Sequence, residues 1–331
     1  MELLMYVDLA RLRRNLAEIR AVCGTDILLM VKADAYGHGM TEIARAAEDC
    51  VDMFGVATVE EGAALRACGI KKDILAAVCA SSEIDFAADN GLTVAAADCA
   101  FADALAECAK RRQPPKVHVK VDTGMHRLGF PSGEAADALR RLMSAGITPE
   151  GIYSHLREPD RLQAERFADA VASARGICPL IKAHLASSSS LGIVSARYDM
   201  VRVGHAAYEG VMTVKSRVIA VRRAKAGEYV GYGRHALAHD TNLAVVFGGY
   251  FDGVRRECAS AVLLRGKPCL PAGSVCMDMF AVDTGDMTAE IGEEVTLTGG
   301  ELPSSEVARQ RQTIDYTVMT GWHGRIKRIY T

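Results

Sequence analysis

The stretch ILLMVK (residues 27–32) is a continuous apolar run that ends in a lysine. A run of this length without alternating polar residues is typical of a strand covered on both faces. Leu9, Leu12 and Leu16 precede it at helical spacing, after Asp8, a residue suited to an N-cap. The chain therefore begins with a helix followed by a buried strand.

The same alternation continues through the first two hundred residues. Stretches rich in Ala, Leu, Arg and Glu, with helical periodicity, separate most of the later strand candidates. Those candidates are residues 53–57, 73–79, 92–96, 117–121, 151–155, 181–186 and 200–204. Eight such units predict an α/β fold of the (β/α)8, or TIM barrel, type. A doubly wound open sheet would give similar local signals, but no G-x-G-x-x-G turn follows the first strand.

After about residue 211 the pattern changes to short β-type runs separated by Gly, Pro, Asp and Lys. The runs are SRVIAVRR (216–223), LAVVFGGY (243–250), SAVLLRG (260–266), SVCMDMFAV (274–282) and EEVTLTG (293–299). We therefore predict two domains, a barrel over residues 1–211 and an all-β domain over residues 212–331.

Composition narrows the classes of function. The 331 residues carry 39 Lys and Arg against 41 Asp and Glu, a formal net charge of -2, which does not favour non-specific nucleic-acid binding. No apolar run approaches the roughly 18–20 residues of a membrane-spanning helix, and no secretory leader is apparent. The 10 cysteines include no C-x-x-C pair. We expect a cytoplasmic protein with reduced cysteines, no membrane partner and no metal site.

Polar residues follow the predicted barrel strands at the ends where barrel enzymes carry their reacting groups. These residues are Lys32, Arg127, His155, Ser188, Arg202 and Gly204. Each alone could be a solvated lysine, a packed histidine or an ion-paired arginine. Taken together, they suggest a specific chemistry. A partly desolvated lysine suggests a Schiff base, and the Ser/Gly pair suggests a bound phosphate. The combination points to pyridoxal phosphate.

The segment VKADAYGHG (31–39) resembles the pyridoxal-phosphate lysine motif of the alanine racemases, which are barrels followed by a β-domain. Other segments also resemble the family and occur in the family's order along nearly the whole chain. They are KVDTGMHRLGF (120–130), YSHL (153–156), HLASSS (184–189), MVRVGHAAY (200–208), VGYGR (230–234), GGYFDG (248–253) and SVCMDM (274–279).

The resemblance implies an isomerase that interconverts L- and D-alanine by two-base α-proton transfer on the external aldimine of pyridoxal 5'-phosphate. Lys32 would form the internal aldimine and act as the base on the D-side of the α-carbon. Tyr232, contributed by the other subunit of a homodimer, would be the base on the L-side. Arg202 would face the pyridine nitrogen, and His155 would link Arg202 to Tyr232.

The resemblance also implies which residues bind the cofactor phosphate and the small amino-acid substrate. Tyr36, Ser188 and the backbone N–H groups around Gly204 and His205 would hold the phosphate. Arg127 and the backbone N–H of Met277 would bind the substrate carboxylate. Lys120 matches a lysine that is often carbamylated in the family and that orients the arginine. The substrate entrance would be lined by Tyr250, Arg255 and Asp278.

Departures from the family pattern leave more than one amino acid as a possible substrate. Ser187 replaces a common asparagine, Ser274 stands where many members carry an arginine, and Gly324 stands where some members supply a tyrosine to the pocket. Alanine is the leading substrate, with serine or a broad range of amino acids as the alternative. A decarboxylase or aldolase of related fold, or a non-catalytic carrier of pyridoxal phosphate, are further alternatives. Arg202 stands against the decarboxylase, whose relatives place an acid there.

Overall fold

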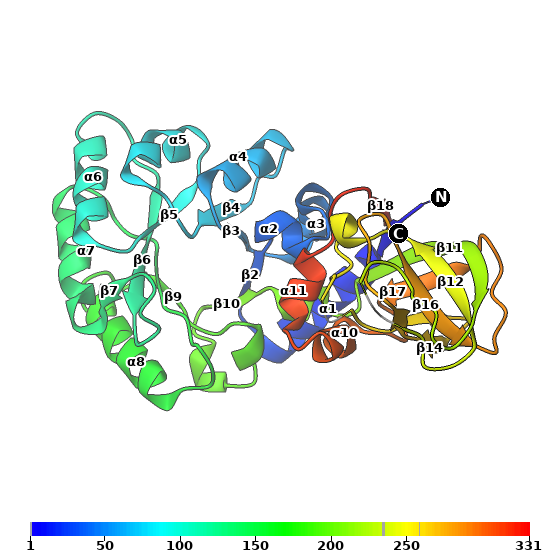
Figure 1. The fold of residues 1–331 in the computed structure, drawn as a ribbon. Helices are drawn as coiled ribbons and strands as arrows, with labels where there is room; N and C mark the ends of the chain where they lie inside the picture. The colour runs from blue at the N-terminus through cyan, green and yellow to red at the C-terminus, as the bar shows by residue number, and fades with distance from the viewer. Residues whose placement is uncertain (1, 234–235, 258) are drawn as a thin grey trace. The chain divides into compact units, whose positions relative to one another are not determined.

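A computed structural model describes residues 2–233, 236–257 and 259–331 (Figure 1). The chain forms two compact units. The barrel unit contains Arg13–Ala35 and Met40–Ala207, and the β unit contains Met1–Leu12, Tyr36–Gly39 and Tyr208–Thr331. None of the helices in the described ranges is long and apolar enough to cross a membrane.

The barrel unit is built on eight parallel strands, as the sequence predicts. In spatial order they are β10 (Met200–Val203), β2 (Asp26–Met30), β3 (Met53–Val56), β4 (Asp73–Ala76), β5 (Thr93–Ala96), β6 (Lys116–Asp122), β8 (Gly151–Tyr153) and β9 (Lys182–His184). A short strand, β7 (Phe130–Pro131), pairs with β6. Two backbone hydrogen bonds link the two ends of the row, from Arg202 to Ala186 at 3.0 Å and from Asp199 to Ala183 at 3.1 Å, so the barrel is nearly closed.

Helices connect the strands, and Figure 1 shows α6, α7 and α8 on the outer side of the strands that they follow. The helices are α1 (Leu9–Cys23), α2 (Lys32–Tyr36), α3 (Met40–Ala47), α4 (Val59–Ala67), α5 (Ile84–Asp89), α6 (Cys99–Ala109), α7 (Ala135–Ser144), α8 (Arg161–Arg175) and α9 (His205–Tyr208). Side chains cap several of them: Thr58, Asp98 and Asp160 accept a backbone N–H from the first turns of α4, α6 and α8. Local sequence therefore fixes where these helices begin.

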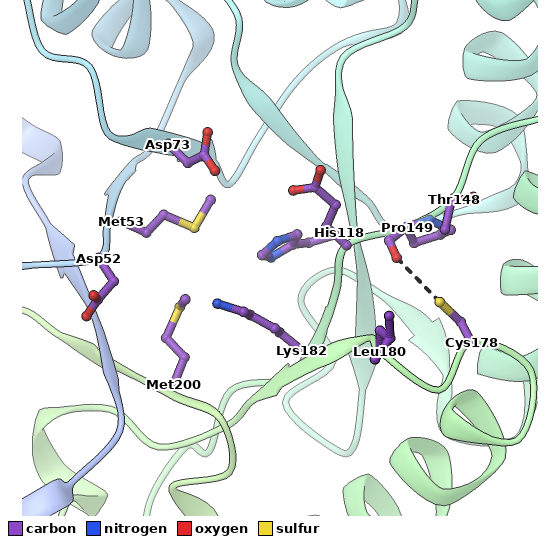
Figure 2. A pocket seen from close by; sticks show the side chains of 11 residues that line it. Asp52, Met53, Asp73, His118, Thr148, Pro149, Cys178, Leu180, Lys182 and Met200 are labelled. Carbon is purple, nitrogen blue, oxygen red and sulfur yellow. Dashed lines mark hydrogen bonds between the residues drawn. The ribbon is translucent and has the colours of Figure 1, made fainter.

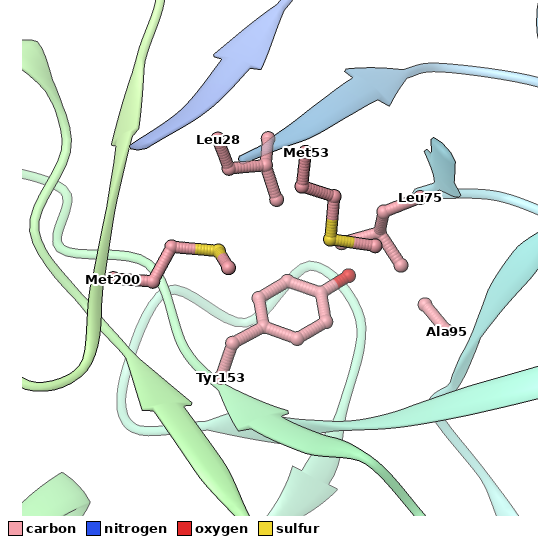
Figure 3. Close-up of a cluster of buried hydrophobic side chains, with 6 residues drawn as sticks. All are labelled: Leu28, Met53, Leu75, Ala95, Tyr153 and Met200. Carbon is pink, nitrogen blue, oxygen red and sulfur yellow. The ribbon is translucent and has the colours of Figure 1, made fainter. Parts of the chain in front are cut away.

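Side chains from six strands fill the centre of the barrel (Figure 3). They are Leu28, Met53, Leu75, Ala95, Tyr153 and Met200, all buried. Inward-pointing side chains that meet in layers are what makes such a barrel a packed core and not a pore. The ring of Tyr153 stacks on His184, with centroids 4.8 Å apart, and so joins this apolar layer to polar groups.

The β unit is an antiparallel sheet with two short helices. Its strands, in spatial order, are β14 (Lys267–Cys269), β13 (Val262–Leu264), β17 (Glu294–Thr298), β11 (Met212–Ala224), β12 (Thr241–Phe247), β16 (Met279–Gly285) and β15 (Pro271–Ala272). The helices α10 (Ser304–Gln310) and α11 (Asp315–Thr320) precede the last strand, β18 (Lys327–Tyr330). The five β-type runs predicted after residue 211 all contribute strands to this sheet or, at 274–282, begin just before one.

The first strand of the chain also belongs to the β unit. Strand β1 (Leu4–Val7) pairs antiparallel with β11 and parallel with β18. Its four residues carry no turn signal and no long alternation. Their partners lie about two hundred positions later in β11 and more than three hundred positions later in β18. This strand was therefore not predicted from the sequence.

A cavity of about 340 Å³ opens at the amino-terminal end of the barrel strands (Figure 2). Its walls include the first residues of several strands, among them Met53, Asp73, Lys182 and Met200. The buried ring of His118 lies over Gly151, where a Cβ atom would come within 2.6–2.7 Å of three ring atoms. Only glycine leaves room for this ring at the start of β8.

We expect Gly151→Ala to lower the free energy of unfolding by about 1–3 kcal/mol, because the added methyl overpacks the buried histidine. Gly133→Ala is the matched control, since no atom lies within 4 Å of the Cβ position there. Urea unfolding followed by circular dichroism measures both variants. Equal stability of the two would show that the His118 ring does not occupy the space beside Gly151.

Candidate active site

Lys32 lies at the carboxyl end of the first barrel strand, where the sequence analysis placed it. Strand β2 ends at Met30, and Lys32 begins α2 two residues later. Burial lowers the pKa of its amine, and the charge of Arg127 lowers it further, while Glu61 opposes the shift. A lysine with a lowered pKa carries a larger fraction of neutral amine, which is the form that reacts with aldehydes.

The backbone after Lys32 makes a left-handed turn. Ala33, Asp34, Ala35 and Tyr36 have φ values of 52, 54, 53 and 55°. This conformation costs about 1–2 kcal/mol per non-glycine residue, so surrounding contacts must hold it. The carboxylate of Glu61 accepts the N–H of Ala33 at 2.8 Å, and that of Asp34 accepts the N–H of Met40 at 2.7 Å.

Arg202 is buried in β10 and donates to neighbouring loops from both terminal nitrogens of its guanidinium. Nη1 donates to the carbonyl of His184 at 2.8 Å and to its Nδ1 at 2.9 Å. Nη2 donates to the carbonyl oxygens of Ser154 at 2.6 Å and Leu185 at 3.1 Å, and lies 3.4 Å from Nδ1 of His155. These acceptors lie at or just after the ends of β8 and β9, and they fix the plane of the guanidinium.

The charge of Arg202 is not balanced by an acid. Among the residues that the structure describes, no Asp or Glu forms an ion pair with it, and no acceptor takes its Nε–H. Burial lowers the pKa of Arg202 to about 10. One N–H of a rigid, buried cation therefore remains to donate to a ligand.

Arg202 also sets the protonation of three histidines. Because a guanidinium only donates, His184 accepts at Nδ1 and carries its proton on Nε2, and the longer 3.4 Å contact favours the same form of His155. The Nε2–H of His184 then donates to Nδ1 of His118 at 3.0 Å. Burial lowers the pKa of His155 to about 3 and that of His118 to about 4, so both rings are neutral at pH 7. Hydrogen bonds donated in one direction, from Arg202 to His184 and from His184 to His118, thus connect Arg202 to the cavity at the amino-terminal end of the barrel.

Lys120 and Arg127 add two more cationic groups to this side of the barrel. Lys120 is buried, and its Nζ lies 4.6 Å from the centroid of the Tyr153 ring. Burial, together with the charges of Arg202 and Arg127, lowers its pKa to about 7. Arg127 is exposed, on a loop whose turn is held by Asp122 accepting the N–H groups of residues 124–126 at 2.8–3.1 Å.

Ser188, Gly204 and His205 lie together after the last two barrel strands. The hydroxyl oxygen of Ser188 accepts the backbone N–H of Gly204 at 3.1 Å and that of Ala206 at 3.2 Å. Its own proton remains to donate. A phosphate bound at this chain turn could accept these N–H groups in place of the Ser188 oxygen, and the hydroxyl proton would add a further donor.

In the β unit, three of the motifs found in the sequence lie side by side. The N–H groups of Gly248, Tyr250 and Phe251 donate to the carbonyls of Asp278, Cys276 and Met277 at 2.8, 3.0 and 3.3 Å. A Cβ at Gly249 would lie 2.2 Å from the carbonyl oxygen of Cys276, so glycine permits this close approach. The segment 230–231 packs in the same way against residues 273–274. Tyr250, Met277 and Asp278 are thereby brought together.

An arginine that the sequence analysis did not single out holds Asp278. Arg325 forms an ion pair with Asp278 at 2.9 Å and another with the fully buried carboxylate of Asp252 at 2.7 Å. The rings of Phe247 and Phe251 lie 5.4 and 5.2 Å from its guanidinium. This contact fixes the predicted entrance residue Asp278 to the core of the β unit.

The remaining predicted site residues also lie in the β unit. The side chain of Tyr232 is 67% exposed, and Arg234 of the same motif lies outside the described residues. Tyr36 is buried, with its ring 5.1 Å from Tyr208. Arg255 is exposed, whereas its neighbour Arg256 lies 5.8 Å from the ring of Tyr250.

Two family models match the chain in succession. The alanine racemase N-terminal domain matches residues 7–211, and the alanine racemase C-terminal domain matches residues 211–330. The chain belongs to the alanine racemase family. An alanine racemase of Thermobifida fusca is 34% identical, with 98% of this chain and 97% of that protein covered. A catabolic alanine racemase of Pseudomonas putida is 33% identical, with 94% of each covered.

Solved structures agree with this membership. The alanine racemase of Acinetobacter baumannii has a TM-score of 0.89 at 27% identity, with 100% of this chain and 99% of that chain covered. The biosynthetic alanine racemase of Pseudomonas aeruginosa has a TM-score of 0.88 at 31% identity, with 100% of both chains covered. The chain is therefore a racemase, an enzyme of the isomerase class, with a TIM barrel followed by an antiparallel β domain.

Sequence analysis of this racemase missed residues that act through others. Five such residues had no role assigned to them from the sequence: His184, His118, Glu61, Arg256 and Arg325. His184 stands in the HLASSS motif, and Arg325 directly follows the noted Gly324, so both had a positional signal. Glu61 and His118 had none, because nothing local shows that Glu61 contacts Ala33 or that His118 contacts His184.

We expect Lys120 of the racemase to react with carbon dioxide above pH 7. A folded-state pKa of about 7 leaves its amine mostly neutral at pH 8 and mostly protonated at pH 6, and only the neutral amine forms a carbamate. Protein in ¹³C-bicarbonate should show a carbamate signal by NMR at pH 8 that is lost as the pH falls to 6. The signal should vanish in Lys120→Met and persist in Lys110→Met, where the lysine is exposed and paired with Glu107. A signal that survives Lys120→Met would refute the assignment.

Proposed function

We propose that this racemase interconverts L- and D-alanine by two-base proton transfer, with pyridoxal 5'-phosphate as its cofactor. The observation that carries the proposal is the buried guanidinium of Arg202, which has no acidic partner and one N–H left to donate. A guanidinium donor suits an unprotonated pyridine nitrogen of the cofactor, because that nitrogen can accept a hydrogen bond. An acidic residue in its place would suit a protonated pyridine nitrogen.

The barrel residues fit the cofactor at three points. The half-buried amine of Lys32, with its lowered pKa, would hold the aldehyde carbon. Arg202 would hold the ring nitrogen, and Ser188 with the N–H groups of Gly204 and His205 would hold the phosphate. Tyr36 joins the phosphate ligands on the family resemblance.

When bound, pyridoxal phosphate makes the α-hydrogen of an amino acid acidic by delocalising the electron pair that its removal leaves. Inversion then requires a proton donor and acceptor on each face of the α-carbon. The Nζ of Lys32 serves the D-face, and the phenol oxygen of Tyr232 of the partner subunit serves the L-face. The exposure of Tyr232 agrees with a role completed by a second chain.

His155 provides the link that makes a tyrosine usable as a base. Its Nδ1 accepts from Arg202, so its Nε2–H can donate to the oxygen of Tyr232 of the partner subunit and stabilise the phenolate. Because burial lowers the pKa of His155 to about 3, the ring stays neutral and keeps this donor fixed.

Arg127 and the N–H of Met277 bind the substrate carboxylate, Lys120 orients Arg127, and Tyr250, Arg255 and Asp278 line the entrance. We place the enzyme in the cytoplasm as a homodimer with shared sites.

Gly324 has φ 67°, and a Cβ there would lie 2.6 Å from the carbonyl oxygen of Phe251, so this backbone excludes a side chain. Without one, serine and larger amino acids are alternative substrates.

Racemisation assays over a panel of L-amino acids, with the cofactor added, test the function. We expect L-alanine to be racemised with the highest kcat/KM, measured by chiral chromatography. Serine within about a hundredfold of alanine would establish the broader alternative, because a single small group is worth roughly 10–200-fold. No racemisation of any amino acid would contradict the proposal.

We expect Tyr232→Phe to slow exchange of the α-hydrogen of L-alanine with deuterated water by about 10²–10⁴-fold, because a positioned general base is lost. Exchange from D-alanine, which depends on Lys32, should persist. Proton NMR measures both. Tyr229→Phe is the matched control, since that side chain is similarly exposed at 64%. Equal losses from the two enantiomers would contradict the assignment of Tyr232 to one face.

Mixing the inactive variants Lys32→Ala and Tyr232→Phe tests the shared site. After subunit exchange about half of the dimers contain one chain of each kind, and each such dimer has one intact site and one doubly defective site. We therefore expect recovery of about a quarter of the wild-type rate. A mixture that stays inactive, although gel filtration after exchange of tagged chains shows mixed dimers, would place both bases in one chain.

A further inference from the structure

A second cavity, of about 420 Å³, lies within the β unit. The turn after η6 (Tyr250–Asp252) forms one wall, and the ends of α10 and α11 form the other. Its charged lining consists of Arg255, Arg256, Arg311, His323 and Glu257. The lining thus contains three guanidinium groups and an imidazole, but one carboxylate.

Arg311 is the centre of this cavity. It follows directly after α10 and is only 7% exposed. Its Nε–H donates to the hydroxyl of Ser260 at 3.2 Å, and its guanidinium lies 5.9 Å from the centroid of the Trp322 ring. Within the described ranges no acceptor takes the four N–H bonds of its two terminal nitrogens. A buried cation without a counter-ion is unfavourable, so the free fork suits an anion.

The two neighbouring arginines strengthen the positive potential. Arg256 donates to the carbonyl of Val275 at 2.9 Å. Burial lowers the pKa of Arg311, and the charge of Arg255 contributes to the same shift. In the part of the chain that the structure describes, neither Arg255 nor Arg256 forms an ion pair with an acid. By contrast, Arg309, two residues before Arg311, is exposed and fully paired with Glu306.

We propose that this cavity binds a small oxyanion, a phosphate or carboxylate group, through the free guanidinium fork of Arg311. Two parallel N–H bonds of a guanidinium match two oxygens of either group. A cavity of about 420 Å³ falls in the range of small-molecule sites and leaves space for an organic group attached to the anion. The cavity shares Tyr250 and Arg255 with the proposed substrate entrance but contains none of the residues proposed to hold the cofactor. The proposal rests on Arg311, which has no part in the proposed function, so the two can fail separately.

The test is binding to the protein saturated with pyridoxal phosphate, so that the cofactor site does not compete. Inorganic phosphate and malonate are titrated separately by isothermal calorimetry, with sodium chloride keeping the ionic strength constant. We expect saturable binding of at least one of them, with one site per chain. If one of the two anions binds at least about tenfold more tightly than the other, it identifies phosphate or carboxylate as the preferred group.

Arg311→Met should weaken that binding at least about tenfold, because the charged hydrogen bonds are lost while the side-chain volume is nearly kept. Arg309→Met, the matched control, should leave it unchanged. If Arg311→Met does not fold, Arg311→Lys keeps the charge but loses the fork, and it should also weaken binding. Absence of saturable binding by both anions, or equal weakening in the Arg309→Met control, would overturn the proposal.

Discussion

The arrangement of the barrel site depends on one buried cation. Arg202 reaches into the barrel without an acid to balance it, and its N–H groups are taken by carbonyl oxygens and by the Nδ1 atoms of two histidines. A buried guanidinium is tolerated only when nearly all of its donors are satisfied. Loops after neighbouring strands must therefore end at fixed positions around it. The packing of the barrel and the chemistry of the site share this requirement.

Lys32 shows a second constraint of the same kind. Its amine has a lowered pKa because the barrel buries it, and the left-handed turn that follows is an unfavourable backbone conformation. The chain maintains that turn with the carboxylates of Glu61 and Asp34 and with glycines at 37 and 39. A Cβ at Gly37 would lie within 2.4 Å of the carbonyl oxygen of Met319. Strain of this type persists when the surroundings over-determine the conformation, as they do here.

Much of the fold could be predicted from the sequence because its signals are local. The eight strand candidates correspond to the eight barrel strands, because parallel strands that are buried on both faces are rich in apolar residues. Strand β1 could not be predicted, because its pairing with β11 is a long-range contact. The left-handed turn was also missed, since alanine and tyrosine rarely adopt positive φ. At the site, motif spacing placed Lys32 and Arg202 at strand ends, but the contacts of His118 and Arg325 depend on tertiary packing.

The partners of the arginines separate structural from ligand-binding roles. Arg325 is held by two carboxylates and two aromatic rings, so its donors and its charge are both used within the chain. The N–H groups on both terminal nitrogens of Arg202 are used within the chain, but its charge is not balanced and its Nε–H remains to donate. Arg311 has neither its charge nor its terminal donors used. Because an unpaired buried cation opposes folding, such a group persists where a ligand supplies the missing partner. The same reasoning that assigns Arg202 to a ring nitrogen therefore assigns Arg311 to an anion.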